Sequence, residues 1–107
     1  MEVVTVDSSL AGHDASSLLL HDVPSPISLR ELIRLCVREE VAAHNANPNQ
    51  AEKLGWEEQA ERAIAAFGRN GYFVFIGERQ VDMLDEELTL DASEVVRFVR
   101  VFPLVGG

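Results

Sequence analysis

The sequence has little cysteine and no long hydrophobic run. Cys36 is the only cysteine among 107 residues, which excludes an intramolecular disulfide and disfavours a zinc site built on cysteine. No apolar stretch approaches the length that crosses a bilayer, and no basic segment follows Met1. We therefore expect neither a transmembrane helix nor a signal peptide, and we expect a cytoplasmic protein with no membrane partner.

Basic residues are also scarce: nine lysines and arginines stand against 18 aspartates and glutamates, for a net charge of -9. Nucleic-acid binding depends on a basic surface that releases counterions from phosphate, so this balance disfavours a nucleic-acid partner. It favours a protein partner with a basic docking surface. The hydrophobic content of 47% is ordinary for one globular domain. A chain of this length has room for one core, which disfavours a self-sufficient enzyme.

The apolar pattern predicts strands on both sides of two helices. β-branched residues predict a first strand over residues 2–7, small and polar residues predict a turn over 8–16, and a second short strand follows over 18–23. The later strands are expected over 72–76, 79–82 and 94–102, with an acidic connection over 83–91. Strands, helices and strands in this order predict an α+β fold with the helices on one face of a sheet.

The first helix has clear start signals. Ser28 can cap it, and Glu31 can complete a capping box. Apolar residues then recur at three- and four-residue spacing as far as Val41, which predicts one buried helix face. A second helix is expected over 50–68, with Gly68 placed to close it.

The sequence ends in Gly106 and Gly107, after a strand that is not followed by a turn. A residue without a side chain lets the backbone enter a narrow enzyme channel, and its carboxylate is unhindered. At average glycine usage, chance places two glycines at the end of about 0.5% of chains. A frayed end is the alternative interpretation.

Three segments resemble the β-grasp superfamily of ubiquitin and the bacterial sulfur carriers. Residues 72–81 resemble the strand–turn–strand of the carriers, and residues 90–95 resemble the segment before their last strand. Residues 102–107 resemble the proline-containing diglycine tail of the small subunit of molybdopterin synthase. Ala92 and Ser93 replace a Gly-Asp pair of the carriers, and the second helix is an insertion relative to them.

The resemblance implies a β-grasp domain over residues 1–102 and a diglycine tail over 103–107. The domain would be a mixed sheet of four to five strands packed on the first helix. The resemblance also implies that the chain is not an enzyme but a monomeric protein substrate or carrier, with no bound cofactor.

The same resemblance implies the chemistry of the tail. A partner adenylating enzyme of the ubiquitin-activating type would use ATP to activate the Gly107 carboxylate. Gly106 and the extended segment before it would present that carboxylate, and the segment consists of Pro103, Leu104 and Val105.

Three functions remain open at this point. The first is a bacterial ubiquitin-like modifier, served by a conjugating enzyme and a metallopeptidase. The second is a sulfur carrier that forms a C-terminal thiocarboxylate for a cofactor synthase, which the apolar tail before the diglycine favours. The third is a β-grasp interaction module that is never activated.

Other charged and reactive residues offer weaker signals. The candidate residues for docking an acidic partner are Arg30, Arg34, Arg38, Arg97 and Arg100. A solvated surface is the alternative for all five. The histidines, His13, His21 and His44, lack metal-ligand spacing and are expected in loops and on the surface. Cys36 lies on the apolar face of the first helix, so we expect an inert buried thiol there.

Overall fold

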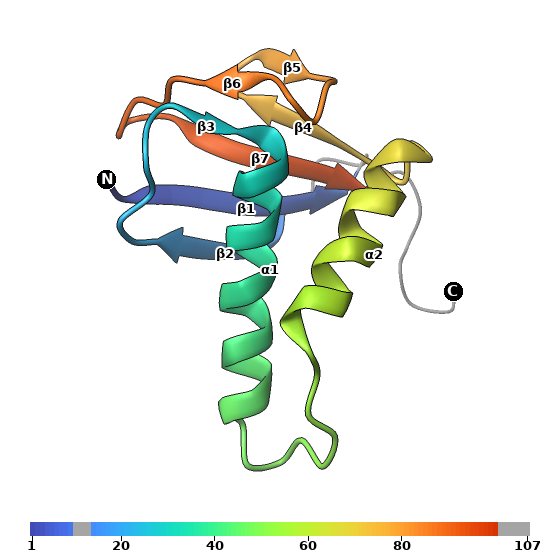
Figure 1. The fold of residues 1–107 in the computed structure, drawn as a ribbon. Helices are drawn as coiled ribbons and strands as arrows, with labels where there is room; N and C mark the ends of the chain where they lie inside the picture. The colour runs from blue at the N-terminus through green and yellow to red at the C-terminus, as the bar shows by residue number, and fades with distance from the viewer. Residues whose placement is uncertain (10–13, 101–107) are drawn as a thin grey trace.

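A computed structural model describes residues 1–9 and 14–100 and has an α+β fold (Figure 1). A five-stranded sheet runs in the order β2-β1-β7-β4-β5. Its strands are β1 (Val3–Ser9), β2 (Asp14–Leu20), β4 (Tyr72–Ile76), β5 (Arg79–Val81) and β7 (Val95–Arg100). β1 and β7 are parallel, whereas the other neighbouring strands are antiparallel. The expected α+β class with a mixed sheet is confirmed.

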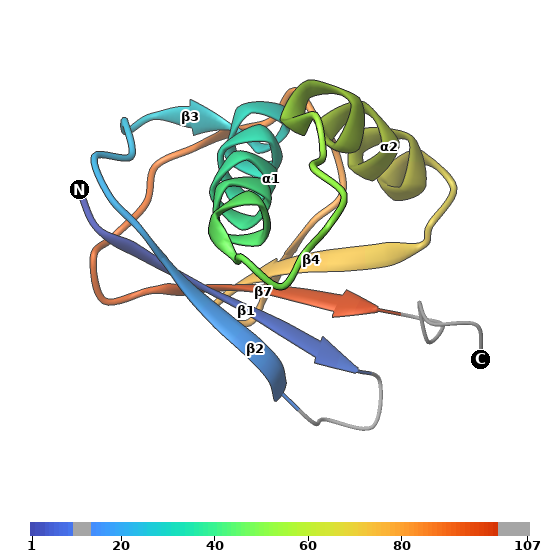
Figure 2. The same ribbon diagram turned by 90° about the horizontal axis from the view of Figure 1, so that it is seen from below.

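Two helices cover one face of this sheet (Figure 2). They are α1 (Leu29–Ala46) and α2 (Trp56–Gly68). A second, two-stranded sheet pairs β3 (Ile27–Ser28) with β6 (Glu87–Leu88) just before α1. The sequence predicts an acidic connection with a few apolar anchors over 83–91, and the fully buried Leu88 is such an anchor. The prediction is wrong in leaving out β6, which forms because Glu87 and Leu88 pair with β3.

The core lies between the sheet and the first half of α1. Leu29 and Leu32 of α1 have no exposed surface, and neither do Val74 of β4 and Val96 of β7. The buried residues of β4 alternate with half-buried ones, as a strand requires. The predicted buried helix face and central strand are thus confirmed. Within the part of the chain that the structure describes, no helix is long and apolar enough to cross a membrane.

The start of α1 agrees with its sequence signals. The Ser28 hydroxyl accepts a hydrogen bond from the backbone N–H of Glu31 at 3.1 Å, which satisfies one of the free donors of the first helical turn. The Glu31 carboxylate faces Arg34, with 3.6 Å between Oε1 of Glu31 and Nε of Arg34. The hydroxyl half of the capping box is therefore present, and the carboxylate forms an ion pair along the helix.

α2 begins at Trp56, later than the predicted start at residue 50. The Asn45 side chain holds the preceding loop, since it accepts a hydrogen bond from Leu54 N at 2.8 Å and donates one to Leu54 O at 2.9 Å. Because both main-chain groups of Leu54 bond to this side chain, they are not available for helical hydrogen bonds, and α2 begins after Leu54. At the other end, Gly68 is helical and Asn70 adopts the left-handed φ of 60°. Asn70 therefore ends the helix in place of Gly68.

β2 begins at Asp14, before the predicted second strand at residue 18. Ser16 and Ser17 predict a turn, but they pair in register with Asp7 and Val6 of β1. Main-chain bonds to a neighbouring strand outweigh the weak turn preference of serine. The strands of the first hairpin are consequently longer than the sequence predicts.

Candidate functional site

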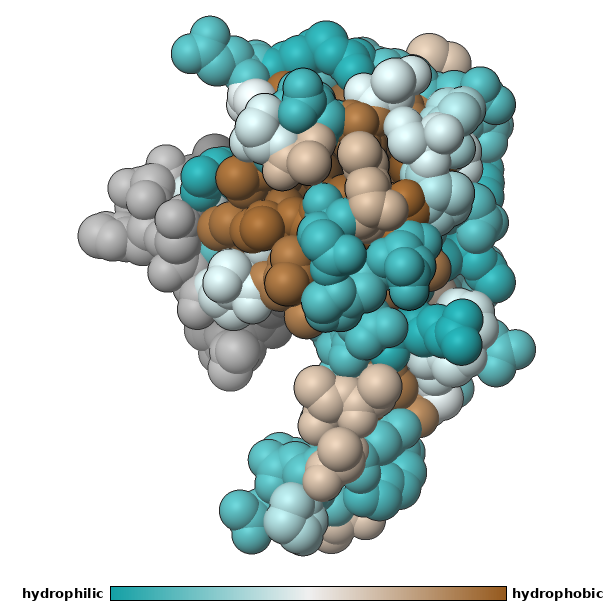
Figure 3. Space-filling view, turned by 90° about the vertical axis from the view of Figure 1, so that its left-hand side faces the viewer, coloured by the Kyte–Doolittle hydropathy of each residue, from teal (hydrophilic) through white to brown (hydrophobic). Residues whose placement is uncertain are grey.

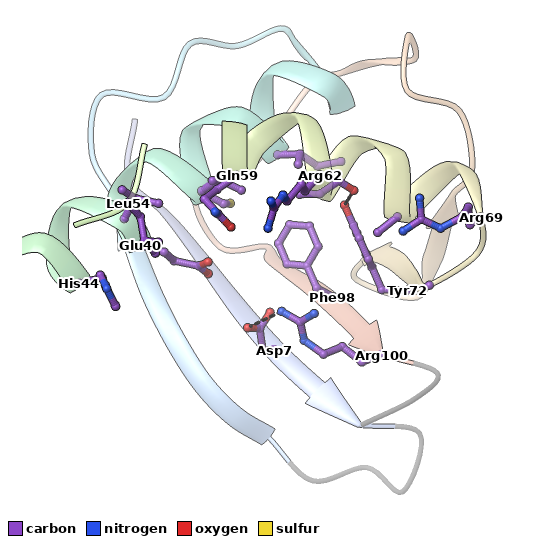
Figure 4. A pocket seen from close by; sticks show the side chains of 17 residues that line it. Asp7, Glu40, His44, Leu54, Gln59, Arg62, Arg69, Tyr72, Phe98 and Arg100 are labelled. Atoms are coloured by element: carbon purple, nitrogen blue, oxygen red, sulfur yellow. Dashed lines mark hydrogen bonds and ion pairs between the residues drawn. The ribbon is translucent and has the colours of Figure 1, made fainter. Parts of the chain in front are cut away.

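A groove opens where the two helices diverge from the sheet (Figure 4). Its volume is about 880 Å³, which is large enough for a drug-sized ligand or several side chains. One face of α1, one face of α2 and the last residues of β1 and β7 form its walls. We call it the helical groove. Its lining residues are Asp7, Ile33, Cys36, Val37, Glu40, Val41, His44, Leu54, Gln59, Arg62, Ala63, Ala66, Arg69, Gly71, Tyr72, Phe98 and Arg100.

α1 forms the groove because it extends past the edge strand β2 (Figure 1). Ile33 and Cys36 are buried in the core. Val37, Glu40 and His44 continue the same helical spacing and line the groove. The predicted apolar face of α1 is therefore buried in the core, and its continuation along the helix lines the groove.

Aromatic side chains form a fixed floor. Tyr72 of β4 contacts Phe98 of β7 edge to face, with ring centroids 6.0 Å apart, and contacts Phe67 at 5.8 Å. The Tyr72 hydroxyl donates a hydrogen bond to Ala63 O of α2 at 2.8 Å. Burial is the largest cause that raises the pKa of Tyr72, so its phenol stays protonated and ties α2 to the sheet.

The rim carries acidic and basic groups at close quarters. Arg100 Nη2 lies 3.4 Å from Asp7 Oδ2. In Figure 4 the Glu40 side chain points from α1 toward this pair. The Glu40 side chain is exposed overall, yet partial desolvation of its carboxylate raises its pKa. The negative charge of Asp7 raises this pKa further, and the positive charge of Arg100 lowers it. Sequence reasoning missed Glu40, although a carboxylate inside an apolar helical stripe was a signal.

Cys36 has the inert environment that the sequence predicts. Its side chain is buried, and burial raises its pKa to about 12, with a further increase from the charge of Glu40 and an opposing hydrogen bond to Thr5. A thiolate is the reactive form of cysteine, so this group is unreactive at neutral pH.

The predicted arginines of α1 are held by neighbouring residues. Arg34 and Arg38 lie over the Trp56 ring, 5.3 Å and 5.7 Å from its centroid. Arg30 approaches Asp85 at 3.4 Å. The two helices are thus joined on their outer side by a tryptophan beneath two guanidinium groups.

The predicted arginines of β7 do not join that set. Arg97 alternates with the buried Val96 and Phe98, so it faces away from the helices, where it donates a hydrogen bond to the Ser8 hydroxyl at 2.9 Å. Arg100 lies on the helix side and lines the groove. The five candidate docking residues therefore occupy three separate surfaces.

An apolar patch lies on the face of the sheet that points away from the helices, beside the polar pair of Arg97 and Ser8. Leu19, Val4 and Val95 lie side by side on β2, β1 and β7, and the first two are 47% and 37% exposed. Figure 3 looks at the side of the molecule that lies on the left of Figure 1, and it shows hydrophobic side chains gathered in the middle with hydrophilic ones around them. We call the residues of β1, β2 and β7 that face away from the helices the outer sheet face.

The structure describes two of the three histidines and none of the predicted tail residues. Pro103, Leu104, Val105, Gly106 and Gly107 lie outside the described residues, as does His13. His21 pairs with Glu2 on the surface, whereas His44 lies on α1 and contacts the backbone oxygen of Glu52 at 3.1 Å. In residues 1–9 and 14–100, no group of three histidine, cysteine, aspartate or glutamate side chains is placed to hold a metal ion.

Comparison with protein-family models, curated proteins and solved structures finds no match to this chain.

Proposed function

We propose that the chain is a ubiquitin-like protein modifier with a β-grasp fold, whose Gly107 carboxylate is activated by a partner enzyme. The observation that carries the proposal is the position of β7. This strand lies in the centre of the sheet, parallel to β1, and leads into the segment that ends in Gly106 and Gly107. A mixed five-stranded sheet with α1 across one face is compatible with a β-grasp.

The reach of that segment suits the proposed role. The seven residues after Arg100 can span at most about 25 Å when fully extended. The glycines could then enter a partner's active site while the folded domain docks outside it. Arg30, Arg34 and Arg38 would offer an acidic partner one docking surface, and the outer sheet face would offer an apolar one.

The proposed chemistry belongs to the partner. An oxygen of the Gly107 carboxylate attacks the α-phosphorus of ATP and displaces pyrophosphate, which gives an acyl adenylate. A thiol of the enzyme then attacks the carbonyl carbon and displaces AMP, since AMP is a good leaving group. The amine of a target displaces the thiol in the last step, so the modifier becomes attached through an amide bond.

The test is ATP–pyrophosphate exchange with an adenylating enzyme from the same organism. We expect exchange with the full chain and none after deletion of Gly106 and Gly107. Exchange that survives this deletion would exclude activation at the diglycine. Gly55→Ala is a matched glycine change outside the tail and should leave the exchange intact, because its Cβ would meet no atom within 4 Å.

A sulfur carrier is the second candidate, and the apolar segment Pro103–Val105 favours it. Such a carrier shares the acyl adenylate but transfers the acyl group to sulfur. Intact mass of the chain identifies a carrier, which gains the difference between one sulfur and one oxygen. A modifier is identified in digested targets, where a lysine carries a branch that ends in Gly106 and Gly107. The third candidate, a module that is never activated, predicts undiminished partner capture by the diglycine-deleted chain.

A further inference from the structure

The helical groove has the shape of an incomplete helix bundle. α1 and α2 run in opposite directions, joined by residues 47–55 (Figure 1). Val37 and Val41 of α1 line the groove, as do Ala63 and Ala66 of α2. The two alanines are small, which leaves room for the close approach of a further helix at the usual axial distance of about 8–10 Å.

The length of the groove and its walls favour a helical occupant. Along α1 it extends from Ile33 to His44, which is about 16 Å at 1.5 Å per residue. The main-chain groups of both helical walls are bonded within their own helices. The helical walls would offer the N–H and C=O groups of an extended peptide no main-chain partners, whereas a helix satisfies these groups internally.

The charges at the rim define the chemistry of the occupant. Among the described residues, the Glu40 carboxylate has no hydrogen bond or ion pair. Two arginines that line the groove are already paired, Arg100 with Asp7 and Arg62 with Glu58. Arg69 lines the groove at the end of α2. A basic group beside Glu40 would offset the repulsion between Glu40 and Asp7.

We propose that the helical groove binds an amphipathic helix of a partner protein, which packs its apolar face between α1 and α2 and pairs one lysine or arginine with Glu40. An acidic residue of the same helix would meet Arg69, and the two contacts together fix its direction. The inference does not rest on activation of Gly107, because the described residues that line the groove all lie between Asp7 and Arg100.

The experiment is an NMR titration of the full chain with designed helical peptides. Two peptides of about 14 residues, or four turns, share one apolar face and differ only in a lysine or glutamate placed to meet Glu40. We expect shifts of the backbone amides along the groove-lining faces of α1 and α2, and about fivefold tighter binding of the lysine peptide, as for a partly exposed ion pair. Glu40→Lys should reverse this preference, while Glu39→Lys, an exposed neighbour outside the groove, should not.

A second pair of variants tests the apolar contact. Ala66→Gln fills the groove and should weaken binding of both peptides, whereas Ala65→Gln, exposed on the outer side of α2, should have no effect. Absence of binding up to about 1 mM peptide would overturn the proposal, because such a contact would then be weaker than specific docking. It is also overturned if the shifts map to the outer sheet face, or if the lysine preference survives Glu40→Lys.

Discussion

At the residue scale, Glu40 is a charged side chain in a groove whose walls are largely apolar. It occupies a position where the spacing of α1 places apolar residues, and its carboxylate faces Asp7 across the groove. Burial disfavours the charged form, and a neighbouring negative charge adds to that effect. A residue that costs the folded state free energy is consistent with a role in binding.

The pH dependence of stability tests this environment. The pKa of Glu40 is raised above its ordinary value of 4.5, so the folded chain binds the proton more tightly than the unfolded chain does. Above the raised pKa, the charged carboxylate therefore lowers the free energy of unfolding. Glu40→Gln should increase that free energy near neutral pH, and the gain should disappear as the pH falls below the ordinary value.

Urea denaturation of both chains across this pH range measures the effect. Glu39→Gln provides the control, because Glu39 is exposed on the same helix and lies outside the groove. An equal gain from the two variants, or a gain from Glu40→Gln that persists in acid, would contradict the assignment.

The core offers a second prediction at this scale. Leu32 of α1 has no exposed surface and belongs to the core between this helix and the sheet. Leu32→Ala should lower the free energy of unfolding by about 2–5 kcal/mol, because it loses buried surface and leaves a cavity. Met83 is 64% exposed, so Met83→Ala should change stability by no more than about 0.5 kcal/mol in the same denaturation experiment.

At the element scale, the sequence predicts the interior of each helix and strand better than its ends. Three- and four-residue spacing locates α1, and a run of strand-forming residues locates β4 with its observed bounds. The start of α2 depends on a side chain far back in the chain, Asn45, and the start of β2 depends on pairing with β1. Local patterns carry no information about either contact.

Two glycines with different backbones give a matched prediction. Gly77 has a φ of +60°, whereas Gly68 is helical and a Cβ there would meet no atom within 4 Å. Gly77→Ala should cost about 1–2 kcal/mol, because the left-handed conformation crowds a side chain. Gly68→Ala should stabilise the protein by up to about 1 kcal/mol through helix propensity and the lower entropy of the unfolded chain. Thermal denaturation of the two variants would contradict this account if their shifts had the same sign.

At the scale of the whole molecule, the candidate site is a product of the packing of α1 against α2. The sequence indicates the apolar face of α1 and the second helix, but the groove exists only because the two helices diverge from the sheet. The sequence also does not show which of the five predicted arginines share a surface. Side chains alternate along β7, so Arg97 and Arg100 lie on opposite faces of the sheet. The diglycine is different, since its signal lies in the residues themselves.

The most direct test of the proposed function is to trap the activated carboxylate with hydroxylamine. In the presence of ATP and the adenylating enzyme, hydroxylamine attacks the carbonyl carbon of the adenylate or thioester and displaces AMP or the thiol. We predict a hydroxamate on Gly107 alone, identified by fragmentation of the intact chain, and none without ATP. An unmodified chain, or a hydroxamate on an aspartate or glutamate in place of Gly107, would contradict activation of the diglycine.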